Sequence, residues 1–492
     1  MLKDYYKLYI NGEWVESESG EFFETYNPAT GEVLSKVAKA SKSDVDTAVT
    51  AARIAFETGK WSRFSHSKRA QVLNKIASIM REKFDELVKA EILNTGKNIP
   101  AARGQVTQAI EDFEFYAGVA LTSGGRTNPM PNNFFNYTLK EPVGVCGQII
   151  PLNYPLMMAA WKIAPALAAG CTVILKPASY TPITAYLLAE ICTEAGVPAG
   201  VVNVITGSGS EIGPYMTEHE GINKIAFTGE TETGKDIMSK ASGTLKRVTL
   251  ELGGKSPSII FADTEIEDAV NGSLYSIFYN TGQSCEARSR IFVEESIYEE
   301  FLNRFVEKTK QLKVGDPFNK GTHVGAVISS SHEKVIDDYV KLAVEEGGTV
   351  LCGGSRPEGK EFANGYWYLP TVISDVTNES RIAQEEVFGP VVVVMKFTNE
   401  REAIEMANHS IYGLASAVWT TNHAKANRVA AKINAGIVMI NSPISAFPGT
   451  PFGGYKQSGF GRELSLETFD LYTETKSVVS YVGEKQLNMF GL

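Results

Sequence analysis

The 492-residue sequence has few cysteines, no grouped histidines and no long apolar run, and each absence excludes a class of protein. Its five cysteines form no CxxC pair, so neither a disulfide framework nor a zinc site is indicated. The six histidines form no HxxxH or HxxE grouping, and we therefore predict no metal site. No apolar run reaches the roughly 18 residues of a membrane helix, and the start of the chain has no signal-like apolar core. We expect a cytoplasmic protein with no membrane partner.

The composition is that of a globular protein. Hydrophobic residues make up 43% of the chain and charged residues 21%, without a biased or repetitive segment. The net charge is -10 and the basic residues are scattered, which argues against a nucleic-acid partner. A chain of this length is expected to form two or three domains of roughly 100 to 200 residues each.

Turn and helix signals organise the first quarter of the chain. Residues 7–15 place Asn-Gly between two short apolar-aromatic runs, which predicts a β-hairpin. From residue 43 to about residue 125 the apolar residues recur at helical spacing, and we predict two or three helices there.

Short apolar strands alternate with helical segments between residues 143 and 251. About five strands occur in this region, and the alternation predicts βαβ units in a parallel, doubly wound sheet. Ligands of such sheets bind at the carboxyl ends of the strands. We therefore expect a binding site formed by the loops at 151–155, 176–181, 206–209 and 228–234.

A second α/β region follows and extends to about residue 442. Apolar runs at 259–261, 289–293, 326–328 and 391–397 predict its strands. The tail at 471–482 alternates polar with apolar or aromatic residues, as an edge strand does, and we expect it to serve assembly.

Taken singly, the local motifs leave the chemistry open. Gly207 to Gly213 reads GxGxxxG rather than a dinucleotide fingerprint, and GGKS at 253–256 lacks the first glycine of a Walker A loop. Cys285 is either an exposed, polarised thiol or a buried structural one. Glu251 is either a general base with a raised pKa or a solvated strand end. Asn153, between two prolines, is either a fixed amide donor or part of a plain turn.

Seven short motifs in one fixed order are more specific than any single one. They are PLNYP at 151, KPAS at 176, FTGET at 227, LELGGKSP at 250, GQSC at 282, EEVFGP at 385 and PFGGYKQSG at 451. Together they resemble the aldehyde dehydrogenase superfamily over essentially the whole chain.

The resemblance implies an α/β fold with three parts. A Rossmann-like NAD(P)-binding domain would comprise residues 1–118 and 143–252, and an α/β catalytic domain residues 253–457. An oligomerisation β-arm would comprise residues 119–142 and 470–492, which implies a homodimer or homotetramer.

The resemblance also assigns the chemistry, which is oxidation of an aldehyde to a carboxylic acid with NAD(P). Cys285 would be the nucleophile, Asn153 and the Cys285 backbone N–H the oxyanion hole, and Glu251 the base that activates water to hydrolyse the thioester. The cofactor pocket would be formed by Leu152, Lys176, Ser179, Gly209, Gly213, Thr228, Gly229, Glu230, Leu252, Glu386 and Phe388. The substrate tunnel would be lined by Tyr154, Trp161, Ser284, Glu286 and Phe452.

In the cofactor pocket, the sequence departs from the family pattern at three positions. NAD-preferring members usually carry Glu at the position of Ser179, where the carboxylate repels a 2'-phosphate. We therefore predict that NADP is accepted, with the Lys176 ammonium available to its phosphate. Glu230 stands where many relatives have Ser, and an acidic side chain there cannot donate to phosphate. Leu152 replaces a common Trp, which alters the cofactor-side wall without removing a reacting group.

Beside the nucleophile, Glu286 and Arg288 replace residues that are often small or uncharged in relatives. They either pair structurally, or Glu286 reaches the tunnel and favours a cationic aldehyde together with Tyr154 and Trp161. Phe452 stands where such specialists often carry Trp, so we favour a broad aliphatic or aromatic range.

Two other functions compete with aldehyde oxidation. Relatives that pass the thioester to CoA or phosphate commonly lack the equivalent of Glu251, and a silent homologue would lack the nucleophile. The presence of Glu251 and Cys285 argues against both.

Overall fold

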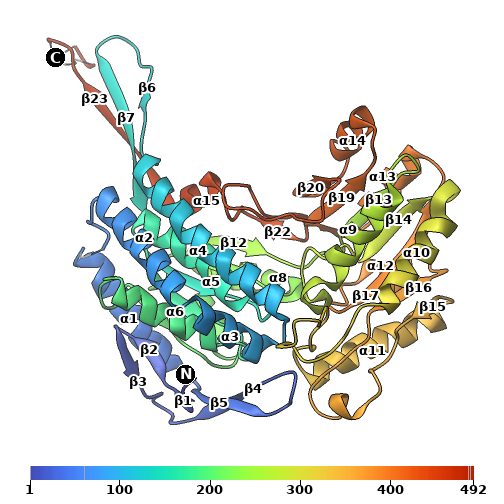
Figure 1. Ribbon diagram of the computed structural model, residues 1–492. Helices are drawn as coiled ribbons and strands as arrows, with labels where there is room; N and C mark the ends of the chain where they lie inside the picture. The colour runs from blue at the N-terminus through green and yellow to red at the C-terminus, as the bar shows by residue number, and fades with distance from the viewer. Residues whose placement is uncertain (1, 60, 486, 488, 492) are drawn as a thin grey trace.

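A computed structural model describes residues 2–59, 61–485, 487 and 489–491 of the chain. Two α/β halves lie side by side, and a narrow arm that carries the C-terminus projects from the first half (Figure 1). Both halves are α/β, in agreement with the predicted fold class.

The first half is built on an eight-stranded sheet. Its strands, in spatial order, are β22 (Gly459–Phe460), β12 (Arg247–Glu251), β11 (Lys224–Thr228), β8 (Val145–Ile149), β9 (Thr172–Lys176), β10 (Val202–Val204), β2 (Leu8–Ile10) and β3 (Glu13–Val15). β8 to β12 are parallel, as predicted for this stretch, and β2 and β3 form the predicted hairpin. Because the five central strands are parallel, the four predicted loops leave the sheet at the same edge.

Alternate side chains of these strands enter two different cores. Val145 and Ile174 pack in the core that contains α1, while Cys146 and Val173 pack in the core that contains α5 and α6. Because these strands are buried on both faces, their sequences are continuously apolar rather than alternating. The covering helices are α1 (Lys42–Glu57), α7 (Ile212–Glu218) and α8 (Thr231–Ala241) on one face, and α5 (Pro155–Ala169) and α6 (Ile183–Glu194) on the other.

The helical stretch before the sheet contains four helices, where two or three were predicted. These are α1, α2 (His66–Glu82), α3 (Phe84–Thr95) and α4 (Ile99–Thr122). Gly96, with a φ of 74°, ends α3, and the Asn98 side chain caps α4 two residues later. A left-handed glycine followed by an N-cap residue separates two helices that apolar spacing alone merges.

The second half is built on a seven-stranded sheet. Its order is β15 (Thr349–Cys352), β16 (Thr371–Ser374), β17 (Val391–Phe397), β14 (Arg290–Glu294), β13 (Pro257–Ile260), β19 (Ala415–Trp419) and β20 (Ile437–Ile440). The predicted strand at 326–328 is wrong. Ala326 N–H donates to the Gly96 carbonyl at 3.0 Å and Val327 N–H to the Tyr366 carbonyl at 2.9 Å, so this apolar run bonds to loops. A short apolar run does not by itself distinguish a strand from a buried loop.

The remaining elements complete the two halves. The helices are α9 (Ile266–Phe278), α10 (Tyr298–Lys310), α11 (Ser330–Glu345), α12 (Arg381–Gln384), α13 (Glu400–Asn408), α14 (His423–Ala430) and α15 (Leu466–Leu471). Two small sheets join β1 (Tyr5–Tyr6), β5 (Val33–Ala38) and β4 (Phe22–Tyr26), and β18 (Tyr412–Gly413) with β21 (Tyr455–Lys456).

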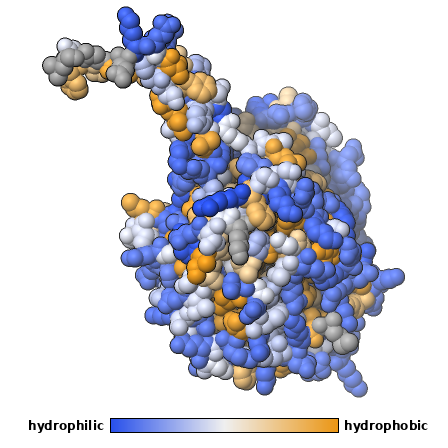
Figure 2. Space-filling model, turned by 90° about the vertical axis from the view of Figure 1, so that its left-hand side faces the viewer, coloured by the Kyte–Doolittle hydropathy of each residue, from blue (hydrophilic) through white to orange (hydrophobic). Residues whose placement is uncertain are grey.

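The arm contains the predicted tail strand and the hairpin near 120–142. β23 (Thr473–Tyr481) pairs along its whole length with β7 (Phe134–Pro142), which also pairs with β6 (Thr127–Asn128). Hydrophobic side chains lie on its surface, away from the body (Figure 2). They include Phe135, Leu139, Val479 and Val482, which are 40% to 63% exposed.

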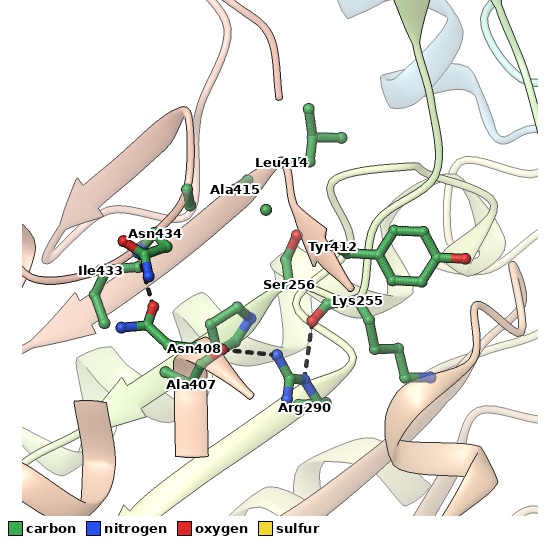
Figure 3. Close-up of a pocket in the computed structure, with 13 residues that line it drawn as sticks. Lys255, Ser256, Arg290, Ala407, Asn408, Tyr412, Leu414, Ala415, Ile433 and Asn434 are labelled. Carbon is green, nitrogen blue, oxygen red and sulfur yellow. Dashed lines mark hydrogen bonds between the residues drawn. The ribbon is translucent and has the colours of Figure 1, made fainter. Parts of the chain in front are cut away.

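A buried arginine anchors the start of β14. Arg290 Nε donates to the Lys255 carbonyl at 2.9 Å and Nη2 to the Ala407 carbonyl at 3.0 Å, inside a small pocket between β13 and α13 (Figure 3). Nη1 donates to the carbonyls of Met406 and His409, both at 3.3 Å. These bonds tie the LELGGKSP segment to the second sheet.

Within the described part of the chain, no helix has both the length and the apolar character needed to cross a membrane. No group of three or more His, Cys, Asp or Glu side chains is placed to hold a metal ion among the same residues.

Candidate active site

Cys285 follows a backbone kink that places it in a pocket between α5 and α9. Asn280 and Thr281 have φ values of 53° and 59°, which are rare outside glycine and strained for a β-branched residue. At Gly282, with a φ of 70°, a Cβ would lie 2.1 Å from the Gly389 carbonyl oxygen. Cys285 is partly exposed, whereas Cys146, Cys171 and Cys192 are buried. The place of Cys285 in the pocket wall favours the exposed thiol over the structural one, and its role stays a prediction.

The surroundings of Cys285 favour the neutral thiol. Burial raises its pKa well above the usual value, and the negative charges of Glu386, Glu286 and Glu251 raise it further. A thiolate nucleophile at this position therefore requires a proton acceptor or a bound positive group.

Asn153 lies against the loop at 279–285, called the nucleophile loop because it carries Cys285, and is held by buried polar contacts. Its Nδ2 donates to the Gln283 carbonyl at 2.9 Å, and Asn280 Nδ2 donates to the Asn153 carbonyl at 3.2 Å. Lys97 Nζ also donates to the Asn153 carbonyl, at 3.0 Å. These contacts show a fixed amide rather than a plain turn.

Lys97 is a positioning residue that the sequence reasoning missed. Its ammonium is 2% exposed and bonds to Glu91 Oε2 at 2.9 Å and to Gln105 Oε1. Glu91 Oε1 in turn accepts from the Leu156 N–H at 3.0 Å and from the Thr184 hydroxyl at 2.7 Å. This buried pair fixes the start of α5 and the Asn153 loop together.

Glu251 ends β12 as a buried carboxylate, so the alternative of a solvated strand end is wrong. The side chain is 5% exposed, and neither of its oxygens has a hydrogen-bond partner among the described residues. Burial raises its pKa well above the usual value and the Glu463 charge raises it further, while Lys162 and Arg462 oppose the rise. A carboxylate in this state is suited to accept a proton near neutral pH.

Lys162 and Glu463 were also missed, although Lys162 left a signal in the sequence. It is the one charged residue of the otherwise apolar α5, and it is fully buried. Its Nζ pairs with Glu463 Oε1, while Glu463 Oε2 has no partner among the residues described. A charge in an apolar helix predicts a buried partner, but it does not identify which one.

All five predicted tunnel residues line one pocket together with Cys285. Tyr154 directly precedes α5 and Trp161 lies on it, Ser284 and Glu286 flank Cys285, and Phe452 packs edge-on against Trp161 with ring centroids 4.9 Å apart. Other lining residues are Gln105, Gln108, Met157, Met158, Tyr275, Tyr279 and the segment 443–446. Aromatic rings and two methionine thioethers therefore form a large part of the wall.

The predicted cofactor residues lie at the carboxyl edge of the first sheet. Lys176 ends β9 with Ser179 in the following loop, Gly209 and Gly213 precede or begin α7, and Thr228, Gly229 and Glu230 join β11 to α8. Leu152 follows β8 and Leu252 follows β12. Lys176 is 4% exposed, and burial lowers its pKa to about 8.

Two cofactor residues come from the second half. Glu386 Oε1 accepts from the Gly254 N–H at 3.2 Å, and burial raises the pKa of this carboxyl to about 7. Phe388 has a φ of 55°, and its carbonyl contacts His332 Nε2 at 2.7 Å. The residues assigned to the nicotinamide side therefore come from the half opposite to the Lys176 loop.

Replacing Lys97 with Met should lower the free energy of unfolding by about 3 to 5 kcal/mol, because Glu91 would keep a buried charge without its cation. Lys83→Met is a matched control, since Lys83 pairs with Glu194 at 2.6 Å with side chains 38% and 50% exposed. The loss of that exposed pair should cost about 0 to 1 kcal/mol. Chemical denaturation of both variants measures the difference, and equal losses would contradict the assigned role of Lys97.

Comparison with known proteins identifies the family. The sequence profile of the Aldehyde dehydrogenase family matches residues 14–478. The chain is 42% identical over 485 residues to betaine aldehyde dehydrogenase of Bacillus subtilis (strain 168), covering 98% of this chain and 99% of that protein. It is 46% identical over 484 residues to retinal dehydrogenase 2 of Homo sapiens, covering 98% of this chain and 93% of that protein.

A solved structure agrees with these sequence relatives. Betaine aldehyde dehydrogenase from Staphylococcus aureus in complex with NAD+ matches with a TM-score of 0.97 at 41% identity, covering 100% of this chain and 97% of that chain. The resemblance inferred from the seven motifs is confirmed, and the chain belongs to the aldehyde dehydrogenase family.

Proposed function

We propose that this aldehyde dehydrogenase converts its substrate through a thioester on Cys285. The Cys285 thiolate adds to the aldehyde carbonyl carbon and forms a thiohemiacetal with a negatively charged oxygen. NAD(P), when bound, accepts the hydride that leaves this carbon, so that a thioester remains. Water then attacks the thioester, and the carboxylic acid and the free thiol are released.

Asn153 and the Cys285 backbone N–H are proposed to stabilise the negative oxygen. The Asn153 amide donates one N–H to the Gln283 carbonyl at 2.9 Å, which leaves its second N–H for the substrate. A donor of this kind typically contributes about 3 to 4 kcal/mol of transition-state stabilisation. The contact from Lys97 to the same loop keeps that amide in place.

Glu251 is proposed to activate the hydrolytic water and to accept the Cys285 proton. Its charge is near enough to raise the pKa of Cys285, and its own oxygens have no competing partner among the residues described. The observation that carries the proposal is that the held Asn153 amide and the unpartnered Glu251 carboxylate both lie close to the loop that carries Cys285. The presence of Glu251 favours hydrolysis over transfer of the acyl group to CoA or phosphate.

Two variants test the proposed roles. Cys285→Ala should abolish aldehyde-dependent formation of reduced nicotinamide, measured by its absorbance. Glu251→Gln should slow turnover roughly 10² to 10⁴ times, because both the base for hydrolysis and the acceptor of the Cys285 proton are lost. Activity that persists in Cys285→Ala would overturn the mechanism.

Wild-type turnover should rise with pH through the raised pKa of Glu251, since only the carboxylate accepts a proton.

The polar groups at the edge of the first sheet fit a dinucleotide. The Thr228 hydroxyl is buried without a partner among the described residues, just before the N-terminus of α8, where N–H groups attract phosphate. Glu386 would hold the nicotinamide ribose, and Lys176 and Ser179 would hold the adenosine ribose. Glu230 is exposed and accepts from the Thr233 hydroxyl at 3.1 Å, a contact within the first turn of α8.

NADP is proposed as a cofactor alongside NAD. The Ser179 hydroxyl donates to the Gly207 carbonyl at 3.1 Å, so no carboxylate opposes a 2'-phosphate here. The buried Lys176 ammonium bonds only to the Pro177 carbonyl, at 3.4 Å, among the contacts described, and it is therefore free to bind the phosphate.

Ser179→Glu should reduce kcat/KM for NADP by at least about tenfold, because it places a negative charge against the phosphate. The value for NAD should change by less than about threefold. Steady-state kinetics with both cofactors test this, and Ser239→Glu, at an exposed position near the C-terminal end of α8, is the control for an added charge. A strong NAD preference of the wild-type enzyme would contradict the proposal.

A broad range of uncharged aliphatic or aromatic aldehydes is proposed as substrate. Met157, Met158, Trp161 and Phe452 give the pocket an adaptable apolar wall. The names of the relatives do not narrow the choice, because betaine aldehyde is cationic whereas retinal is a long apolar aldehyde.

The arm is proposed to join copies of this chain into a homodimer or homotetramer. Val479→Asp, at a side chain that is 55% exposed on β23, should therefore lower the molecular mass in solution, measured by light scattering after gel filtration. Val335→Asp, on α11 and 42% exposed, is the control and should leave the mass unchanged. An unaltered mass for Val479→Asp would count against assembly through the arm.

A further inference from the structure

The pocket that contains Cys285 has the parts of a site for a cation. Glu286 lies in its wall with a side chain that is 21% exposed, and it is the one charged side chain among the described lining residues. The rings of Tyr154, Tyr275 and Tyr279 line the same pocket. Aromatic faces beside a carboxylate attract quaternary ammonium groups.

The Glu286 carboxylate is already paired with Arg288, which does not itself line the pocket. Arg288 is 1% exposed, and its Nη1 pairs with Glu286 Oε2 and donates to the Glu286 carbonyl at 3.1 Å. Its Nη2 donates to the carbonyl of Pro443, which lies in the lining segment 443–446. The guanidinium therefore fixes the Glu286 side chain and joins the nucleophile loop to this part of the wall.

A carboxylate that is paired with a guanidinium in this way presents little net negative charge to the pocket. A carboxylate attracts a cation strongly only when no other positive charge lies beside it, and here the guanidinium is in direct contact. A cationic substrate entering the pocket would lose hydration and would gain a carboxylate that is already paired. An uncharged aldehyde incurs no such loss.

We propose that Arg288 is a specificity-determining residue, which neutralises Glu286 and so selects uncharged aldehydes over cationic ones. This inference rests on the proposed reaction at Cys285. It assigns the preference to the Glu286–Arg288 pair. The shape of the pocket cannot distinguish two substrates that have the same shape and differ only in charge.

Betaine aldehyde and tert-butylacetaldehyde are the matched substrates for the test. They have the same shape, but carbon replaces the quaternary nitrogen in the second. The readout is the ratio of kcat/KM for the cation to that for the uncharged aldehyde, compared between variants. Differences in hydration of the free aldehydes cancel in this comparison, and so does a general loosening of the wall.

Breaking the pair from either side should move the ratio in opposite directions. Arg288→Gln leaves the Glu286 carboxylate unpaired and should raise the ratio at least tenfold. Glu286→Gln leaves the guanidinium unpaired and should lower it at least tenfold. The double variant Glu286→Gln/Arg288→Gln has no charge at either position and should return to within about threefold of the wild-type ratio. Lys334→Gln, in an exposed pair with Asp338 on α11, should leave the ratio unchanged.

The double variant is decisive, and it buries no unpaired charge, so it remains available if Arg288→Gln does not fold. A tenfold fall in its ratio would show that Glu286 binds the cation in the wild-type enzyme and would overturn the proposal. Equal ratios in all variants would overturn it as well. Failure of the reaction itself would appear differently, as no oxidation of either aldehyde or as activity that survives in Cys285→Ala.

Discussion

The chain passes from the first sheet to the second through two glycines, each in close contact with another segment. A Cβ on Gly253 would lie 2.2 Å from Glu386 Oε2, and one on Gly254 would lie 2.3 Å from the Cys285 carbonyl oxygen. Gly254 therefore lets this crossing meet the Cys285 loop backbone to backbone, and Gly253 leaves room for the Glu386 carboxylate. Glu251 lies just before this crossing and Arg290 anchors its far side, so the positions of the proposed reacting groups depend on that close approach.

Around the crossing, the structure buries charges that a purely apolar core would omit. The Lys162–Glu463 pair joins segments far apart in the sequence, and the Lys97 ammonium joins Glu91 on α3 to the distant Asn153 loop. Removing such charges from water is costly, and apolar residues of similar volume often stabilise a core as well. What the charges provide here is position, because an ammonium in contact with a carbonyl and a carboxylate fixes the geometry of a loop. The loop fixed by Lys97 carries Asn153, and the pair at Glu463 lies beside Glu251.

The sequence predicted the elements whose signal is local. The five parallel strands between residues 145 and 251 were foreseen from their doubly buried apolar runs, and the hairpin at 8–15 from its Asn-Gly turn. The run at 326–328 misled because its composition suits a strand while its backbone partners lie in distant loops. At the site, local sequence left Cys285, Glu251 and Asn153 undecided, and the order of seven motifs brought them together. Lys97, Lys162 and Glu463 were not predicted, because each acts through a partner that only the tertiary structure supplies.

The stretch from Phe452 to Tyr481 supplies three separate parts of the molecule in thirty residues. It places Phe452 against Trp161 in the pocket, adds β22 beside β12 at the edge of the first sheet, and ends as β23 in the arm. On a ribosome this stretch emerges after most strands of both large sheets have been synthesised. The pocket wall, the sheet edge and the arm therefore all depend on one late stretch, and a nascent chain cannot complete any of the three until these thirty residues have been made.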